Sequence, residues 1–256
     1  MLINSFKLFL NKLIAFTGYK ISSLKYIYDS ESNLIKSINF LKIKSVIDVG
    51  ANEGQFVLKL LRKSFRGNIL SFEPLTEPHK KLLLNAKKNK KIISWNVAEK
   101  CGLGSNNFSD HIFVSRHSES SSLLKILPKH INLKPLSKII STEKINIKKL
   151  DNFYADISKL KKNIFLKIDT QGYEMEVLKG ATKTLKLITG LIVEVSLVKL
   201  YEKQPLWLDI VNFLKKKNFI IWSVDRVMGN MDTGETYQLD VTFVKKNVIF
   251  NNNKHS

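Results

Sequence analysis

Residues 46–56, VIDVGANEGQF, constrain the fold more than any other part of the chain. An apolar segment, Ser45–Val49, runs into a loop with two glycines, Gly50 and Gly54, and a helical pattern begins directly after it. A strand, a glycine turn and a helix in this order form the first unit of a doubly wound α/β sheet. Because glycine has no Cβ, we expect a ligand to lie against the backbone at Gly50, where the helix N-terminus offers free N–H groups.

The spacing of this loop indicates which ligand it holds. A dinucleotide loop reads G-x-G-x-x-G, whereas this loop reads D-x-G-x-x-x-G and has no third glycine. Asp48 is predicted to point into the crevice, where a carboxylate repels a pyrophosphate but suits an ammonium or sulfonium group. The ligand that fits is S-adenosylmethionine, and the loop resembles motif I of the class I methyltransferases. The alternative is a glycine turn in an α/β domain that binds no nucleotide.

The next two expected strands extend this prediction. Asn68–Phe72 is the second strand, and Glu73 follows it just before a proline. A carboxylate at this position accepts hydrogen bonds from the two hydroxyl groups of a ribose, in dehydrogenases as well as in methyltransferases. Residues 92–97 form the third expected strand, which places Asn96 or Ala98 near an adenine.

The amino-acid composition limits the kinds of partner that the chain is expected to bind. The net charge is +20, but the basic residues are nearly all lysine, whereas phosphate and base recognition favours arginine. Nucleic acid is therefore an unlikely partner, and the charge reflects either compositional drift or an anionic partner such as a membrane face or an acidic glycan. A single cysteine, Cys101, excludes an internal disulfide and a multi-cysteine metal site, and it fits a cytoplasmic, reducing compartment.

The chain of 256 residues, 44% hydrophobic, is long enough for one domain with appendages. We expect an amphipathic helical extension over residues 1–28, a main domain over 29–246 and a polar tail over 247–256. The extension carries one apolar stripe, too short to span a bilayer, made of Leu2, Phe6, Phe9, Leu13 and Phe16. It is expected to pack on the domain, on a partner such as a second copy, or on the inner face of the membrane.

Residues 99–162 are predicted to be an irregular insertion that overhangs the crevice and selects the acceptor. Within it, residues 108–115 and 144–148 have strand patterns. His111 and His117 lie in this insertion and are candidate general bases, although a histidine on a loop is more often simply solvated.

Residues 163–169 form the fourth expected strand, apolar apart from Lys167, and it ends at Asp169. A helix opens near Glu174 and stops at Gly180, and the fifth strand contains Glu194 among apolar neighbours. A carboxylate in such a strand needs a partner, and a salt bridge from Glu194 to Lys167 is one hypothesis.

Four segments in this order and at these separations, VIDVGANEGQF, ILSFEP, FLKIDTQGYEMEVLKGA and LIVEVS, resemble the FkbM family of S-adenosylmethionine-dependent methyltransferases. The resemblance covers about residues 30–246. It implies a Rossmann-like, doubly wound, mostly parallel sheet with an antiparallel last strand, and methyl transfer to a hydroxyl of a sugar or natural product. Carried over to this sequence, it assigns the cofactor to Asp48, Gly50, Asn52, Gly54 and Glu73, and places Asp169 against the transferred methyl group. The neighbouring Ala51, Gln55 and Asn96 complete our predicted cofactor site.

Methyl transfer to a hydroxyl needs a group that takes its proton. The candidate catalytic residues are Asp169, Glu174 and Glu194, with Asp169 also a candidate ligand of Mg²⁺. The alternatives are a nucleotide-dependent oxidoreductase or epimerase, a nucleic-acid methyltransferase and a non-catalytic binding module. The sequence settles neither the acceptor nor the oligomeric state.

Overall fold

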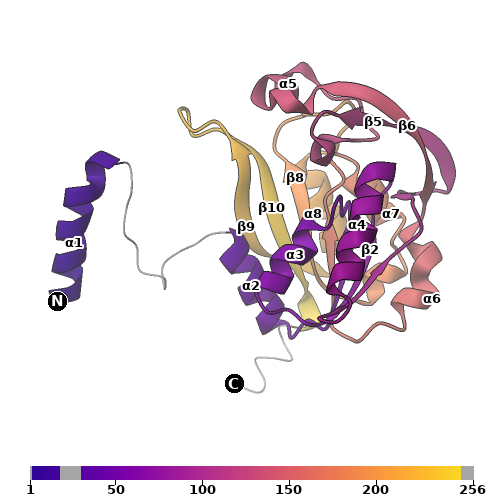
Figure 1. Cartoon of the computed structure of the whole chain (residues 1–256), viewed down its shortest axis with the longest axis horizontal. Coiled ribbons are helices and arrows are strands. Elements are labelled where there is room, and N and C mark those ends of the chain that lie inside the picture. Colours follow the sequence, from indigo (N-terminus) through magenta and orange to yellow (C-terminus); the bar gives the residue numbers. More distant parts are fainter. Residues whose placement is uncertain (1, 18–29, 249–256) are drawn as a thin grey trace.

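The computed structural model describes residues 2–17 and 30–248, and its main body is built on one mostly parallel sheet (Figure 1). In the described residues this sheet has seven strands in the order β3-β2-β1-β7-β8-β10-β9, and only β10 runs against the others. The strands are β1 (Ser45–Val49), β2 (Asn68–Phe72), β3 (Ser94–Val97), β7 (Ile164–Ile168), β8 (Ile188–Ser196), β9 (Phe219–Gly229) and β10 (Thr236–Lys245). The predicted doubly wound sheet with an antiparallel last strand is confirmed.

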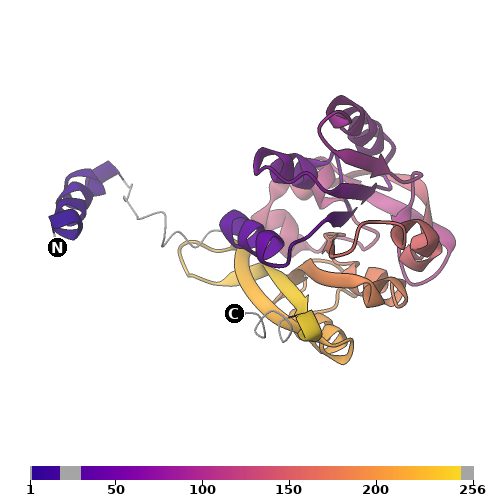
Figure 2. The ribbon, with the colours of Figure 1, turned by 90° about the horizontal axis from the view of Figure 1, so that it is seen from below.

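Helices cover both faces of the sheet, as the two views show (Figures 1 and 2). All five residues of β1 and of β7 are buried, which is why these central strands read as mainly apolar runs, interrupted only by Ser45, Asp48 and Lys167. One core contains side chains of α2 (Ser30–Phe40), α3 (Gln55–Arg62) and α4 (Thr76–Asn89). The core on the other face contains side chains of α6 (Tyr154–Ile157), α7 (Glu174–Lys179) and α8 (Trp207–Lys216). The helices predicted after the glycine loop and from Glu174 to Gly180 are both present, as α3 and α7.

The insertion between β3 and β7 is more regular than predicted. It forms a second sheet of three strands in the order β4-β6-β5, made of β4 (Gly102–Leu103), β5 (Phe108–Ser115) and β6 (Ile139–Lys148). A short helix, α5 (Pro128–Leu133), lies between β5 and β6 along the chain. Ile112, Ile145 and Ile147 pack on Leu75 in a small core of their own. β5 has the bounds predicted for the strand 108–115, and β6 ends at Lys148 as predicted but begins earlier, at Ile139.

The N-terminal extension forms a helix, α1 (Leu2–Ile14), followed by a short 3₁₀ turn, as predicted. The apolar stripe is exposed: Phe6, Phe9, Leu13 and Phe16 each leave more than half of their surface accessible. None of the described helices is long and apolar enough to cross a membrane. Residues 18–29 and 249–256 lie outside the described residues, so the predicted domain boundaries remain predictions.

Candidate active site

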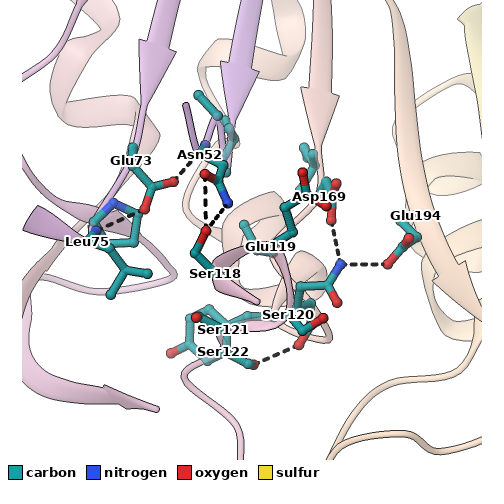
Figure 3. Close-up of a pocket in the computed structure, with 18 of the residues that line it drawn as sticks. Asn52, Glu73, Leu75, Ser118, Glu119, Ser120, Ser121, Ser122, Asp169 and Glu194 are labelled. Atoms are coloured by element: carbon teal, nitrogen blue, oxygen red, sulfur yellow. Dashed lines mark hydrogen bonds between the residues drawn. The ribbon is translucent and has the colours of Figure 1, made fainter. Parts of the chain in front are cut away.

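A cavity of about 610 Å³ lies where β1, β2, β7 and β8 end, and the insertion covers it (Figure 3). Its volume is typical of sites for small molecules and cofactors. One side is lined by the loop after β1 and by Glu73, and the other side by Asp169, Glu194 and Asp240. The insertion contributes a run of polar residues, 117–122, and a second run, 134–137. Residues of the insertion therefore form part of the cavity wall, and its role in selecting the acceptor stays a prediction.

The loop after β1 supplies four of the predicted cofactor residues to the cavity wall, Gly50, Ala51, Asn52 and Gln55. Gly50 has a φ of +71°, and an added Cβ would overlap the main-chain carbonyl oxygen of Asp169. The close approach of the end of β7 is therefore sufficient to require glycine here, and the contact of a ligand with Gly50 stays a prediction. Gly54, with a φ of +93°, does not line the cavity, because it faces the ring of Trp95, which would lie 2.7 Å from an added Cβ.

We expect Gly50→Ala to destabilise the protein, because the new methyl group must displace the backbone at Asp169. Gly234→Ala is the matched control, since Gly234 has a similar φ of +76° but no atom within 4 Å of its Cβ position. The control carries only the strain of a left-handed residue, about 1–2 kcal/mol. Thermal unfolding of both variants measures the difference. Equal losses of stability would show that backbone strain alone requires glycine at position 50.

Glu73 lies between the cavity and two backbone N–H groups (Figure 3). The N–H of Asn52 donates to its Oε2 at 2.8 Å, and the N–H of Leu75 donates to its Oε1 at 2.9 Å. Each carboxylate oxygen can accept one more hydrogen bond. Burial raises the pKa of Glu73 to about 7 and outweighs the two backbone hydrogen bonds, which lower it. The carboxyl group is thus placed to accept hydroxyl donors from a ligand in the cavity.

Asp48 does not point into the cavity, which corrects our prediction. Its side chain is fully buried beneath the floor, and Oδ1 lies 3.2 Å from Nζ of Lys167 on the neighbouring strand β7. Lys167 also donates to the main-chain oxygen of Gly50 at 2.8 Å and lies 3.6 Å from Oδ2 of Asp169. Burial raises the pKa of Asp48 despite the lysine, while the two aspartates hold the pKa of Lys167 above its ordinary value against its own burial. The hypothesis of a Glu194–Lys167 salt bridge is wrong, because the ammonium group pairs with aspartates.

The partner of Glu194 is instead a pair of glutamines. Nε2 of Gln171 donates to Asp169 Oδ1 at 2.8 Å and to Glu194 Oε2 at 3.0 Å, so its amide bridges the two carboxylates. Nε2 of Gln238, on β10, donates to the same Oε2 at 2.8 Å. Tyr201 fixes the bridge, because its hydroxyl donates to Oε1 of Gln171 at 2.8 Å. Burial, and then the charge of Asp169, raise the pKa of Glu194 well above its ordinary value.

Asp240 is a cavity residue that the sequence did not indicate. It lies directly opposite Glu194 in the antiparallel pairing of β10 with β8. Burial, followed by the charge of Asp169, raises its pKa to about 6. These two carboxylates meet only because β8 and β10 pair in this register. A long stretch of chain separates the two strands, so no local sequence pattern predicts the contact.

Besides Asp48 and Gly54, two more predicted site residues, Glu174 and Asn96, do not line the cavity. The Glu174 carboxylate is buried beneath the turn after β7, where its Oε1 accepts the N–H groups of Thr170 at 3.0 Å and Gly172 at 2.9 Å. Glu174 therefore shapes the turn that carries Asp169. Asn96 lies in β3 with an exposed side chain and does not line the cavity.

Of the two histidines, His117 lines the cavity and lies 3.6 Å from Oε2 of Glu119, whereas His111 is exposed on β5. Throughout residues 2–17 and 30–248, no group of three or more His, Cys, Asp or Glu side chains could hold a metal ion. The geometry therefore gives the predicted Mg²⁺ ligand role of Asp169 no support.

The strand order and the carboxylates that follow β2 and β7 define the Rossmann-like fold of the class I methyltransferases. Residues 48–221 match the methyltransferase FkbM domain, and the chain belongs to this family. It is 28% identical over 159 residues to Methyltransferase 1 of Beauveria bassiana (strain ARSEF 2860), an alignment that covers 58% of this chain and 63% of that protein. The crystal structure of methyltransferase FkbM from Methylobacillus flagellatus KT is similar in fold, with a TM-score of 0.50 and 16% identity, over 78% of this chain and 43% of that one. The chain thus spans less than two thirds of the length of either relative.

Proposed function

We propose that this chain is an S-adenosylmethionine-dependent methyltransferase that methylates a hydroxyl group of a glycan or of a small natural product. The observation that carries the proposal is the Glu73 carboxyl group, which faces the cavity with one accepting position free on each oxygen. Two adjacent hydroxyl groups of a ribose match that arrangement.

The residues present fit the cofactor. A second group of carboxylates, Asp169, Glu194 and Asp240, lines the other side of the same cavity and favours a positively charged ligand there. When bound, S-adenosylmethionine would supply a methyl group on a sulfonium that is already a good leaving group. Glu73 would hold the ribose, and the loop residues Gly50, Ala51, Asn52 and Gln55 would hold the rest of the nucleoside. The lack of a third glycine in the loop and the carboxylates around the cavity favour this ligand over a dinucleotide.

The chemical work left for the protein is to orient the acceptor and remove its proton. Asp169 is the best placed base, because its carboxylate is partly accessible from the cavity and is held on one side by Gln171. Serine hydroxyls of residues 118–122, together with Glu119 and Lys134, line the insertion side of the cavity. Such a surface offers many hydrogen-bond donors and acceptors, which suits an acceptor with several hydroxyl groups.

Calorimetry tests the cofactor directly. We expect S-adenosylmethionine and its demethylated product to bind and NAD not to bind. Binding of NAD with no heat from either adenosyl compound would refute the proposal. We also propose a cytoplasmic location, because a chain with a single cysteine, Cys101, fits a reducing compartment.

Glu73→Ala should weaken binding of the demethylated product by about 1.5–3 kcal/mol, because two charge-assisted hydrogen bonds are lost.

The affinity of the unaltered protein for the demethylated product should also rise between pH 6 and pH 8. The hydroxyl donors bind the ionised carboxylate, and Glu73 ionises with a pKa of about 7. We expect a gain of up to about ten-fold. Glu73→Gln, which cannot ionise, is the control and should remove this pH dependence; a pH dependence that survives in it would assign the effect to another group.

A further inference from the structure

A cluster of cations lies at the end of the sheet opposite the cavity, where the parallel strands begin. A hollow of about 420 Å³ lies between the starts of β1, β2 and β7, and none of the described residues that line it is acidic. Five of its lining residues are basic, and we call them the basic edge: Lys42, Lys44, Lys63, Arg66 and Lys161. The carboxylates of the cavity lie at the other ends of the same strands. The charged residues described around the hollow are therefore all cations, whereas the charged residues around the cavity are mainly carboxylates.

An apolar patch borders the basic edge. The rings of Phe40, at the end of α2, and Trp222, near the start of β9, stack with centroids 5.2 Å apart. Both rings and the neighbouring Ile220 leave more than a third of their surface accessible. Residues of α2 next to Phe40 line the hollow, so the aromatic pair and the cations share one edge. Aromatic side chains beside lysines are typical of surfaces that contact the interface of a bilayer.

Helix α1 has the same combination of properties. Its stripe of Phe6, Phe9, Leu13 and Phe16 is exposed, and no residue before Asp29 in the sequence is acidic. Lys7 and Lys12 lie within the helix. The segment 18–29 joins this helix to α2 and spans about 40 Å at most when fully extended. That reach allows α1 to lie on the same surface as the basic edge.

We propose that α1 and the basic edge together dock the protein on an anionic lipid bilayer. The apolar stripe of α1 enters the interface, while the cations of the basic edge face the lipid phosphates. Neither contact is sufficient alone, because a short amphipathic helix or a small basic surface binds membranes only weakly. The arrangement leaves the cavity, at the opposite end of the sheet, facing away from the lipid. Charge selects this occupant over a second copy, because two chains of net charge +20 repel each other.

Co-sedimentation with vesicles tests the proposal on the full chain. We expect binding to phosphatidylcholine vesicles that contain phosphatidylglycerol, little binding to phosphatidylcholine alone, and a loss of binding in high salt. Lys44→Glu with Lys161→Glu should lower the partition coefficient by about ten-fold or more. The matched control is Lys138→Glu with Lys144→Glu, two exposed lysines of the insertion, which makes the same charge change at the cavity end and should have less than about a two-fold effect.

The helix is tested in the same way. Phe6→Ala with Phe9→Ala should lower the partition coefficient by about ten-fold or more, because two side chains no longer enter the interface. The control is Leu83→Ala with Leu84→Ala, which removes two exposed leucines from α4. All four variants change exposed side chains, and circular dichroism should show unchanged melting.

Three results would overturn the proposal. The first is equal binding to both kinds of vesicle, or binding that the basic-edge variant retains. The second is a duplex RNA that binds through the basic edge more tightly than the anionic vesicles do. The third is a dimer in solution that the Phe6→Ala, Phe9→Ala variant separates, which would assign the stripe to a second copy. None of these results depends on the cofactor, so none of them bears on the methyltransferase proposal.

Discussion

Replacing Asp169 with asparagine should lower kcat by about 10²–10⁴-fold, while the affinity for S-adenosylmethionine stays nearly the same. An amide cannot take the acceptor's proton, but it retains an oxygen that can accept the hydrogen bond from Gln171. The geometry of the bridge to Glu194 is therefore kept while the base is lost. Release of the demethylated product in the presence of a panel of glycans and polyhydroxylated compounds measures the effect.

The control for this substitution is Asp110→Asn, which makes the same chemical change on the exposed face of β5, outside the cavity. It should leave turnover unchanged. A chelator should also leave turnover unchanged if Asp169 acts directly on the acceptor. Full turnover in Asp169→Asn would remove Asp169 from the mechanism. A loss of melting temperature without loss of turnover would assign Asp169 to the turn that follows β7.

Replacing Lys167 with methionine should lower the free energy of unfolding by about 3–5 kcal/mol, since it leaves the Asp48 carboxylate buried without a cation. The double variant Asp48→Asn, Lys167→Met should recover much of that loss, because no buried charge remains to be compensated. Chemical denaturation of the three proteins measures the difference. A double variant as unstable as Lys167→Met would show that the lysine stabilises the fold by packing or through Gly50 and Asp169.

The stability of the Lys167→Met variant should also change with pH in a defined direction. Without the lysine, burial holds the pKa of Asp48 still further above its ordinary value. As pH rises above about 4, the unfolded state releases this proton and the folded state does not, so stability falls with increasing pH. We expect Lys167→Met to be closer to the unaltered protein at pH 5 than at pH 8. If the difference in stability between the two proteins is the same at pH 5 and pH 8, the loss does not come from the protonation of Asp48.

The sequence determined the sheet and the edge at which the site lies. Central parallel strands are buried on both faces, so β1, β7 and β8 appear as mainly apolar runs, and the runs end where the loops begin. Parallel strands run in the same direction, so carboxylates that directly follow such runs lie at the same end of the sheet. Glu73 and Asp169 were found in this way, whereas Glu194, which lies within β8, was found as a carboxylate among apolar neighbours; all three line the cavity.

The tertiary structure decided what each of these groups faces. Asp48 and Glu73 both end apolar strands, yet Asp48 is buried beneath the floor because the register of β1 with β7 puts Lys167 opposite it. Gly50 is required by a carbonyl group more than a hundred residues later in the chain. Asp240 meets Glu194 only through the register of β10 with β8. Such contacts depend on how distant strands pair, and the local periodicity of a sequence carries no information about that pairing.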